Sequence, residues 1–395
     1  MKKLFIAAFM LVSSFGTNVM ADGHAIKMGI ILGFTGPIES LTPAMAGSAE
    51  LAFKEASDSG SLLGGKKIEV VRADSTCVDS AAATAAAEGL ISQGVAAIMG
   101  ADCSGVTGAI ASNVAVPNGV VMISPSATSP GLTTLDDKGF FFRTAPSDAR
   151  GGQILADVTK DRKVKSVAIT YTNNDYGKGL ADVYKAAAEA HGIKVTAVTA
   201  HEDGKADYSS EVATLASAGG DAMAVIGYLD QGGKGIIQAS LDTGAFDTFV
   251  LPDGMVGDSL PEAIGTDLDG SFGQAPGTDS EGAATLVSIA GDSFDATSPF
   301  AAESYDAAAL ILLAMQAAGS KNPADYKGKV FDVANAPGEQ ILPGELAKGM
   351  EILASGGEID YVGASNVELI GAGESAGNYR EITIKDAKIS VDRYR

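Results

Sequence analysis

The chain has 395 residues, which is enough for two domains, each with a hydrophobic core of its own. Apolar residues make up 46% of it and charged residues 19%, a balance that is typical of folded globular proteins and excludes a disordered chain. Acidic side chains (49) outnumber basic ones (28), and the net charge of -21 repels nucleic acids and anionic membrane surfaces. We therefore expect no nucleic-acid partner.

The first 21 residues are typical of a secretory signal peptide. Lys2 and Lys3 precede an apolar stretch over 4–12, and small residues at Val19 and Ala21 flank Met20 as in a cleavage site. The apolar stretch is too short to span a membrane, and no cysteine follows Ala21 to carry a lipid. We expect cleavage after Ala21 and an exported, soluble mature chain.

Cys77 and Cys103 are the two cysteines of the sequence, and in an exported chain they favour a single disulfide. A zinc site would need two more ligands than these thiols supply, and the sequence offers only the histidines His24, His191 and His201. We expect no metal and no cofactor.

In chain order, short β-rich runs alternate with Ala-rich amphipathic stretches. The first series predicts strands at 26–32, 67–72, 95–100 and 120–124, separated by helices at 43–57, 80–93 and 105–114. A second series predicts strands at 166–171, 194–199, 222–228 and 248–251, separated by helices at 176–191, 208–218 and 232–243. This alternation predicts an α/β fold of two lobes, each a doubly wound parallel sheet.

After the second series come three further predicted helices, at 299–318, 323–335 and 344–355, and a strand pattern at 381–391. We expect this part of the chain to complete both lobes, so that several crossings form a hinge and let the lobes close on a ligand. The expected lobes are 22–146 plus 276–355 for the first, and 147–275 plus 356–395 for the second.

Short sequence patterns typical of enzymes are present, but the residues that would complete each catalytic or phosphate-binding site are missing. The run Gly257-Asp258-Ser259-Leu260 is the nucleophile block of one lipase family, yet no histidine follows His201 to act as its base. The run 232–235 has the lysine of a phosphate loop without the Ser or Thr that holds magnesium. The sequence therefore predicts a protein that is not an enzyme, with an exported serine hydrolase as a remote alternative.

Polar side chains follow two neighbouring strands of the first lobe. Cys103, Ser104 and Gly105 come after the strand at 95–100, and a run from Ser124 to Thr128 comes after the strand at 120–124. Both loops should lie at the same edge of the sheet, where ligands of open α/β sheets bind. Hydroxyls and backbone N–H groups there could hold a carboxylate, although either loop alone could be only a cap or a turn.

Three loops of the second lobe should face this edge across a cleft. They carry Tyr176, Tyr228 and Asp253, which lie at or beyond the ends of the predicted strands 166–171, 222–228 and 248–251. A carboxylate could pair with a ligand ammonium, and a tyrosine could cover the aliphatic part of a ligand. Asp253 alone could equally be a turn residue before Gly254.

With these loops in place, the chain resembles the periplasmic amino-acid-binding proteins of ABC transporters, of the leucine/isoleucine/valine-binding type. The resemblance rests on four stretches and covers nearly the whole mature chain: Gly33-Phe34-Thr35-Gly36-Pro37, Gly100-Ala101-Asp102-Cys103-Ser104, Met122 to Pro130, and Asn174-Asp175-Tyr176-Gly177-Lys178-Gly179. It implies a type I periplasmic binding protein fold, a disulfide between Cys77 and Cys103, and a location in the periplasm.

The resemblance also implies roles for individual residues. Ser104 and Thr128 would bind the ligand α-carboxylate, helped by backbone groups of Cys103 and Ser126. Asp253 would take the α-ammonium, and Tyr176 and Tyr228 would close the wall of the second lobe. Asp102 replaces an apolar residue of the family, and it disfavours a strictly aliphatic ligand if its carboxylate faces the pocket.

The sequence thus predicts a substrate-binding protein that captures a small amino acid, of the branched-chain type or a related zwitterion, between its lobes. Its partners would be this small molecule and the membrane permease of an ABC transporter, and the protein would be a monomer. The main alternative is the same scaffold binding a non-amino-acid carboxylate, an amide or urea, for which Asp253 would not be needed.

Overall fold

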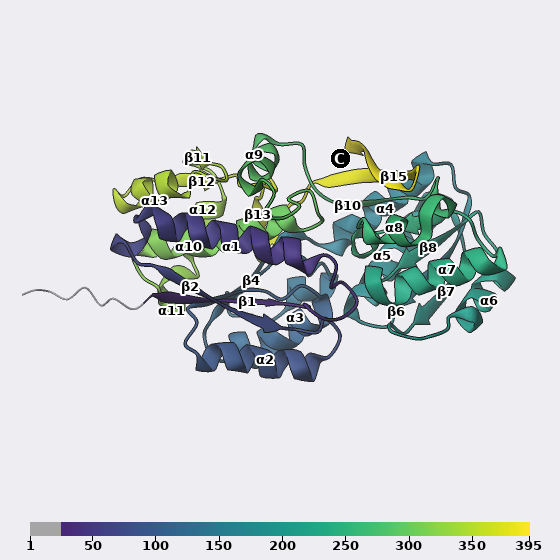
Figure 1. Ribbon diagram of the computed structural model, residues 1–395, viewed down its shortest axis with the longest axis horizontal. Helices are drawn as coiled ribbons and strands as arrows, with labels where there is room; N and C mark the ends of the chain where they lie inside the picture. The colour runs from purple at the N-terminus through teal and green to yellow at the C-terminus, as the bar shows by residue number, and fades with distance from the viewer. Residues whose placement is uncertain (1–24) are drawn as a thin grey trace, which may run out of the picture.

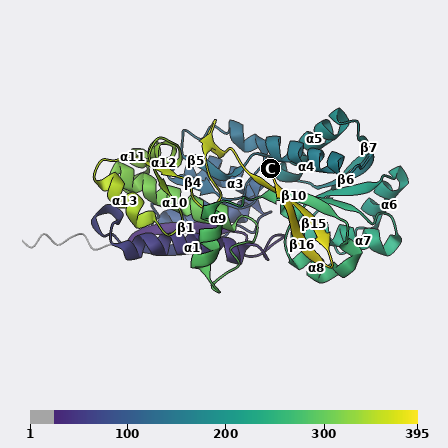
Figure 2. The ribbon, with the colours of Figure 1, turned by 90° about the horizontal axis from the view of Figure 1, so that it is seen from above.

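Two seven-stranded sheets form the centres of two lobes in the computed structural model, which describes residues 25–395 (Figure 1). The signal peptide expected over residues 1–21 lies outside the described residues, as does His24. Seen from above, the lobes lie side by side and join near β10 (Phe272–Pro276) (Figure 2). The two-lobed, parallel-dominated α/β architecture predicted from the sequence is confirmed.

The sheet of the first lobe has the strand order β13-β14-β5-β4-β3-β1-β2, and β1 to β5 run parallel. Helices α1 and α10 lie over one face, and α2 and α3 lie under the other (Figure 1). The strands are β1 (Ile26–Leu32), β2 (Ile68–Asp74), β3 (Ala97–Gly100), β4 (Val121–Ser124), β5 (Phe141–Pro146), β13 (Leu369–Ile370) and β14 (Glu374–Ser375). The covering helices are α1 (Thr42–Ser59), α2 (Ser80–Ser92), α3 (Ser104–Ile110) and α10 (Ala301–Ala318).

Helix α10 is the centre of the first lobe's core. Its residues are buried from Ala301 to Gln316 with the exception of Ala302, and it packs against α1, α12, α13 and the strands β3 to β5. Asp306 is buried within it and accepts hydrogen bonds from the Tyr361 hydroxyl and from the backbone of Ala364 and Ser365. Further elements of this lobe are α9 (Glu281–Ala290), α11 (Pro323–Tyr326), α12 (Lys329–Ala334), α13 (Leu346–Ala354), β11 (Glu339–Ile341) and β12 (Ile359–Tyr361).

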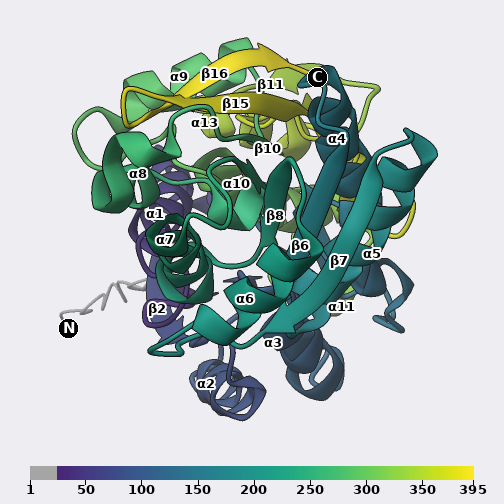
Figure 3. The same cartoon turned by 90° about the vertical axis from the view of Figure 1, so that its right-hand side faces the viewer.

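The second lobe repeats the plan with the strand order β16-β15-β10-β9-β8-β6-β7. Helices α4 and α5 cover one face of this sheet and α7 lies on the other (Figure 3). Its strands are β6 (Ser166–Thr172), β7 (Lys194–His201), β8 (Ala222–Ile226), β9 (Phe249–Leu251), β10, β15 (Tyr379–Lys385) and β16 (Lys388–Tyr394). Its helices are α4 (Asp148–Asp161), α5 (Asp175–Ala190), α6 (Ser209–Ala218), α7 (Lys234–Thr243) and α8 (Ser259–Ile264).

The chain passes between the lobes three times, after β5, after β10 and after β14. The three passages lie next to one another. Pro276 pairs with Tyr379 across β10 and β15, and the Gly277 N–H donates to the Asn378 carbonyl at 3.0 Å. Pro146 pairs with Ser375 across β5 and β14. The multi-crossing hinge expected from the sequence is therefore present.

The C-terminal part of the chain differs from expectation. We expected residues from 356 onward to join the second lobe, but β13 and β14 extend the sheet of the first, and β12 pairs with β11. That expectation is wrong for 359–375, because strands of two or three residues leave no alternating pattern to read. The segment 381–391, whose alternation is typical of a β-hairpin, lies in the hairpin of β15 and β16, with its turn at Asp386 and Ala387. The other lobe boundaries stay predictions.

Within residues 25–395, no helix has both the length and the apolar character needed to cross a membrane.

Candidate ligand-binding site

Loops from both lobes meet around one cavity at the carboxyl ends of the parallel strands, which we call the cleft. Its free volume is about 20 Å³, room for little more than one water molecule, so the two lobes lie closed on one another in this structure. The first lobe contributes Ile38, Leu41, Asp102, Cys103, Ser104, Ser126 and Phe300, and the second lobe contributes Tyr176, Tyr228, Asp253 and Gly254. Seven of the eight residues predicted to bind the ligand line this space.

Ser104 lies at the start of α3, directly after β3, and is only 2% exposed. Its Oγ accepts a hydrogen bond from the backbone N–H of Ser129 at 3.1 Å. The Ser104 proton therefore stays available for a ligand acceptor. The neighbouring Cys103 forms a disulfide with Cys77, as predicted.

The backbone N–H groups expected to help bind a carboxylate are engaged inside the first lobe. The Cys103 N–H donates to the Asp102 carboxylate at 3.0 Å, and the Ser126 N–H donates to Ser124 Oγ at 3.4 Å. The expected help from backbone groups of Cys103 and Ser126 stays a prediction, and these two N–H groups would have to leave their present acceptors to take part. Hydroxyl groups are the donors that remain, and Ser126 directs its own Oγ to the Asp102 carbonyl at 3.0 Å.

Asp102 lines the cleft, but its carboxylate binds other parts of the first lobe. It accepts hydrogen bonds from the Gly33 N–H at 2.5 Å and from Ser75 Oγ at 2.9 Å, as well as from Cys103. Burial raises the pKa of Asp102, and these three donors oppose the rise. Asp102 thus ties the loops after β1, β2 and β3 together, and its partners remove the reason for expecting it to disfavour an aliphatic ligand.

Thr128 is the predicted residue that lies outside the lining of the cleft. Its side chain is 2% exposed, and its Oγ1 has no hydrogen-bond partner among the residues that the structure describes. Its carbonyl accepts the backbone N–H of Asp148 at 2.8 Å, at the crossing into α4. The hydroxyl nevertheless lies close enough to the carboxyl group of Asp148 to lower the pKa of that group.

The wall of the second lobe is built from Tyr176, Tyr228 and Asp253. The Tyr176 hydroxyl donates to Asp253 Oδ1 at 2.8 Å, and the two tyrosine rings stack at 5.1 Å with an angle of 15° between their planes. Gly254 follows without a side chain because a Cβ there would lie 2.6 Å from the Gly227 carbonyl and 2.7 Å from the Tyr176 hydroxyl. All three side chains are at most 4% exposed, so the carboxylate of Asp253 is held in one position.

Asp148 lies outside the lining of the cleft, but its charge is coupled to that of Asp253, and sequence reasoning missed it. It is 2% exposed, and its Oδ2 has no hydrogen-bond partner within residues 25–395. Burial raises the pKa of Asp148 well above its usual range, and the charge of Asp253 raises it further. Burial also raises the pKa of Asp253. Two neighbouring buried carboxyl groups favour a cation between them, because like charges destabilise each other at short range.

Arg143 forms no ion pair with Asp148 or Asp253. It is 1% exposed, and it donates to the carbonyls of Ala127 and Ser129 and forms an ion pair with Glu374 at 2.6 Å. Asp148 looks in the sequence like an ordinary acidic residue in the first turn of a helix. Its place behind the cleft depends on the crossing after β5, which no local pattern indicates.

The apolar part of the cleft was also missed in the sequence. Ile38 and Leu41 lie in the segment between β1 and α1, and Phe300 is the residue immediately before α10. Phe300 has a positive φ of 64°, a conformation that is rare for an aromatic residue and that places it at the helix entrance. These side chains add apolar surface to a cleft that also holds the carboxyl group of Asp253.

Ser259 lies outside the lining of the cleft, at a contact between the two lobes. Its Oγ donates to Asp230 Oδ1 at 3.1 Å and lies 3.4 Å from Ser40 Oγ of the first lobe. His201, the base that such chemistry would need, is buried and bonds to Thr170 Oγ1. No cluster of residues that could bind a metal occurs between residues 25 and 395.

Comparison with known proteins agrees with this architecture. The sequence model of the periplasmic binding protein family matches residues 25–336, so the chain belongs to that family. "Leu/Ile/Val-binding protein homolog 1" of Brucella melitensis is 30% identical over 325 residues, which cover 80% of this chain and 84% of that protein. The predicted family resemblance is confirmed.

Two solved structures share the fold. The leucine-binding protein of Thermotoga maritima superposes with a TM-score of 0.78 at 21% identity, covering 94% of this chain and 98% of that one. A solute-binding protein of an ABC transporter from R. palustris, solved with benzoate, superposes with a TM-score of 0.76 at 20% identity, covering 94% and 96%.

Proposed function

We propose that the protein captures a small α-amino acid, of the branched-chain type or a related zwitterion, between its lobes and delivers it to the membrane permease of an ABC transporter. The observation that carries the proposal is the carboxylate of Asp253, which the Tyr176 hydroxyl fixes across the cleft from the uncommitted proton of Ser104. An ammonium and a carboxylate at the two ends of one ligand complement this arrangement.

The remaining groups fit the same ligand. Asp148 adds a second buried carboxyl group, whose pKa the charge of Asp253 raises and the Thr128 hydroxyl lowers. Ile38, Leu41 and Phe300 supply an apolar environment for an aliphatic side chain. The names of relatives point the same way, since several are called Leu/Ile/Val-binding proteins. The protein acts without catalysis in this proposal.

The proposal also includes the export, the cellular location and the oligomeric state of the protein. Residues 1–21 direct export and are cleaved after Ala21, and the mature chain works in the periplasm as a monomer. The permease distinguishes the closed lobes from the open ones, because ligand binding shifts the population toward the closed form.

A second candidate ligand is an aromatic carboxylate. The benzoate-bound neighbour shares the fold, and the stacked Tyr176–Tyr228 pair offers an aromatic face. Such a ligand would use the hydroxyls of the first lobe and would leave Asp253 and Asp148 without a cation, which favours the zwitterion.

Thermal unfolding of the mature protein tests the proposal. The protein is unfolded and refolded to remove any carried-over ligand, and is then heated with a panel of α-amino acids, benzoates, amides and urea. A ligand at 100 times its Kd stabilises by about 2.7 kcal/mol and should raise the Tm by roughly 2 °C. A rise with aliphatic α-amino acids is the expected result. A rise with benzoates, amides or urea alone would overturn the ligand assignment and keep the class of protein.

A further inference from the structure

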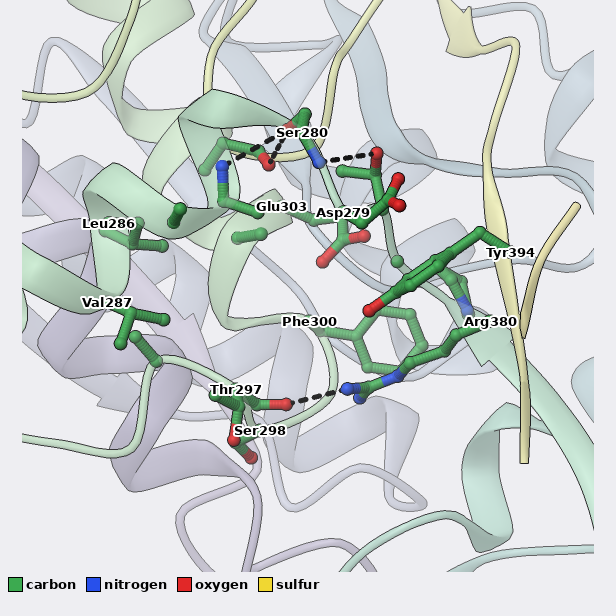
Figure 4. A pocket seen from close by; sticks show the side chains of 18 residues that line it. Asp279, Ser280, Leu286, Val287, Thr297, Ser298, Phe300, Glu303, Arg380 and Tyr394 are labelled. Carbon is green, nitrogen blue, oxygen red and sulfur yellow. Dashed lines mark hydrogen bonds between the residues drawn. The ribbon is translucent and has the colours of Figure 1, made fainter. Parts of the chain in front are cut away.

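A second cavity lies between the lobes, on the far side of Phe300 from the cleft. It has a volume of about 340 Å³, far more than the free space in the cleft, and we call it the α9–α10 cavity. Its walls come from both lobes, with α9 and the start of α10 on one side and Pro276, Arg380 and Tyr394 on the other. Figure 4 shows these side chains surrounding the space. The volume suits a molecule of a few heavy atoms.

One wall carries a buried carboxyl group that the cleft does not use. Glu303 is 3% exposed, and no side chain or neighbouring backbone N–H in the described part of the chain hydrogen-bonds to its carboxylate. Burial raises the pKa of Glu303 to about 7, and the nearby charge of Arg380 opposes that rise. The backbone N–H of Glu303 itself also opposes the rise, and no other residue in the described part of the chain donates to this carboxylate, which leaves acceptor positions for a ligand that brings a positive charge or a hydrogen-bond donor.

The facing wall carries a guanidinium group. Arg380 donates one hydrogen bond, to the Thr297 carbonyl at 2.9 Å, while its Nε is buried and has no partner among residues 25–395 (Figure 4). Arg380 and Glu303 influence each other's charge but do not form an ion pair. Two opposite charges that face one space without meeting leave room for a molecule that contacts both.

Apolar side chains line another part of the cavity, away from Arg380 (Figure 4). Leu286 and Val287 come from α9, and Phe300 separates this space from the cleft, because it lines both. Val287 is 46% exposed, although it is a large aliphatic residue at the edge of a cavity. A short hydrocarbon chain would cover this surface and gain stability from its burial.

We propose that the α9–α10 cavity is a second small-molecule site, which takes a short ω-amino acid with its ammonium on Glu303 and its carboxylate on Arg380. The site is separate from the cleft, and the proposal does not rest on which ligand the cleft binds. Since its walls belong to both lobes, an occupant contacts Glu303 on one lobe and Arg380 on the other and stabilises their closed arrangement.

The test uses γ-aminobutyrate and 5-aminovalerate as probes, with butyrate and butylamine as their singly charged halves. Binding is measured by titration calorimetry at pH 8 on the mature full-length protein carrying Asp253→Asn, which disables the cleft for zwitterions. We expect at least one ω-amino acid to bind with a Kd of about 1 mM or tighter. Each half should bind roughly tenfold more weakly, because it makes one charged contact and not two.

Three further substitutions in the same background decide where the probe binds. Glu303→Gln and Arg380→Gln should each weaken binding roughly tenfold or more. Ala284→Phe adds bulk from the exposed face of α9 and should block the cavity with both charges in place. Glu281→Gln is the matched control, since Glu281 is exposed on α9 outside the cavity lining, and it should leave the affinity unchanged.

Failure of both ω-amino acids to bind would overturn the proposal, and so would binding that Glu303→Gln and Ala284→Phe leave intact. Restoring Asp253 and measuring α-amino acid binding on the Glu303→Gln protein keeps the two sites distinct. Loss of cleft binding in that variant would indicate one continuous site and would also overturn the proposal.

Discussion

Tyr176 and Asp253 meet in the cleft although 77 residues separate them, and the tyrosine hydroxyl donates to the carboxylate at 2.8 Å. The Gly254 N–H donates to the same carboxylate oxygen at 2.9 Å and lies 3.2 Å from the tyrosine oxygen. The carboxylate thus has a fixed direction before any ligand arrives. A group held in this way loses little freedom on binding, which favours affinity.

Tyr176→Phe should weaken binding of an α-amino acid roughly tenfold. The substitution keeps the ring stacked on Tyr228 and removes only the hydroxyl that orients Asp253, a hydrogen bond to a charged group worth about 1.5–3 kcal/mol. Calorimetric titration measures the change. Tyr184→Phe is the matched control, because that buried hydroxyl bonds to Thr159 inside the second lobe and should affect stability alone. Equal affinities for wild type and Tyr176→Phe would contradict the role given to Tyr176.

Asp253→Asn should weaken α-amino acid binding by about 100-fold or more, since the ligand ammonium then lies buried without its charged partner. The folded protein should not lose stability at pH 7, because the neutral amide removes a charge that raises the pKa of Asp148. Titration and thermal unfolding of the same sample report both effects. Asp247→Asn, an exposed site near β9, provides the control. Unchanged affinity would indicate a ligand that has no ammonium group.

Asp230→Ala should shift the lobes toward the open form. Asp230 of the second lobe accepts from the Ser40 N–H of the first at 2.9 Å, and its own N–H donates to the Pro37 carbonyl at 2.8 Å. The side-chain contact favours closure, so its loss should raise the ligand dissociation rate several-fold and enlarge the radius of gyration of the free protein. Stopped-flow fluorescence and small-angle scattering measure the two effects. Asp242→Ala, an exposed change on α7, should alter neither.

The stability of the protein should depend on pH through Glu303. Burial raises its pKa from an ordinary value of 4.5 to about 7 in the folded state, so the folded protein binds more protons than the unfolded one. Stability is therefore greatest below the unfolded pKa and falls as the pH rises through 7. The raised pKa corresponds to a loss of about 3 kcal/mol between pH 4 and pH 8.

Glu303→Gln should remove this contribution. The difference in unfolding free energy between the variant and the wild type, measured by urea denaturation, should move in favour of the variant as the pH rises from 5 to 8. Glu281→Gln, at an exposed glutamate, should show no such trend. A difference that stays constant with pH would mean that the Glu303 carboxyl titrates normally.

Strands with a continuous apolar run were predictable from the sequence. The predicted 26–32 and 166–171 agree with β1 and β6 within one residue, because a buried parallel strand needs such a run and turn residues bound it. Strand β5 was missed. It contains the charged Arg143 in its centre, and that residue is tolerated there only because Glu374, 231 positions later, pairs with it.

The residues of the candidate site also fall into those that were predictable from the sequence and those that were not. Ser104, Tyr176, Tyr228 and Asp253 follow predictable strands, and the sheet places them at one edge. The behaviour of Asp102 was not predictable, since its partner Gly33 is 69 residues away and only the folded loops bring them together. The place of Asp148 was not predictable either, because it depends on where the chain crosses between the lobes after β5.

The three adjacent crossings have a mechanical consequence. A single strand between two bodies would allow them to twist and slide, whereas three segments fixed side by side bend easily in one direction and resist torsion. The lobes should therefore travel along one path, and Ser104 should arrive opposite Asp253 in the same alignment at each closure. Such a guided motion lets a few fixed polar groups select a ligand by its length and by the order of its charges.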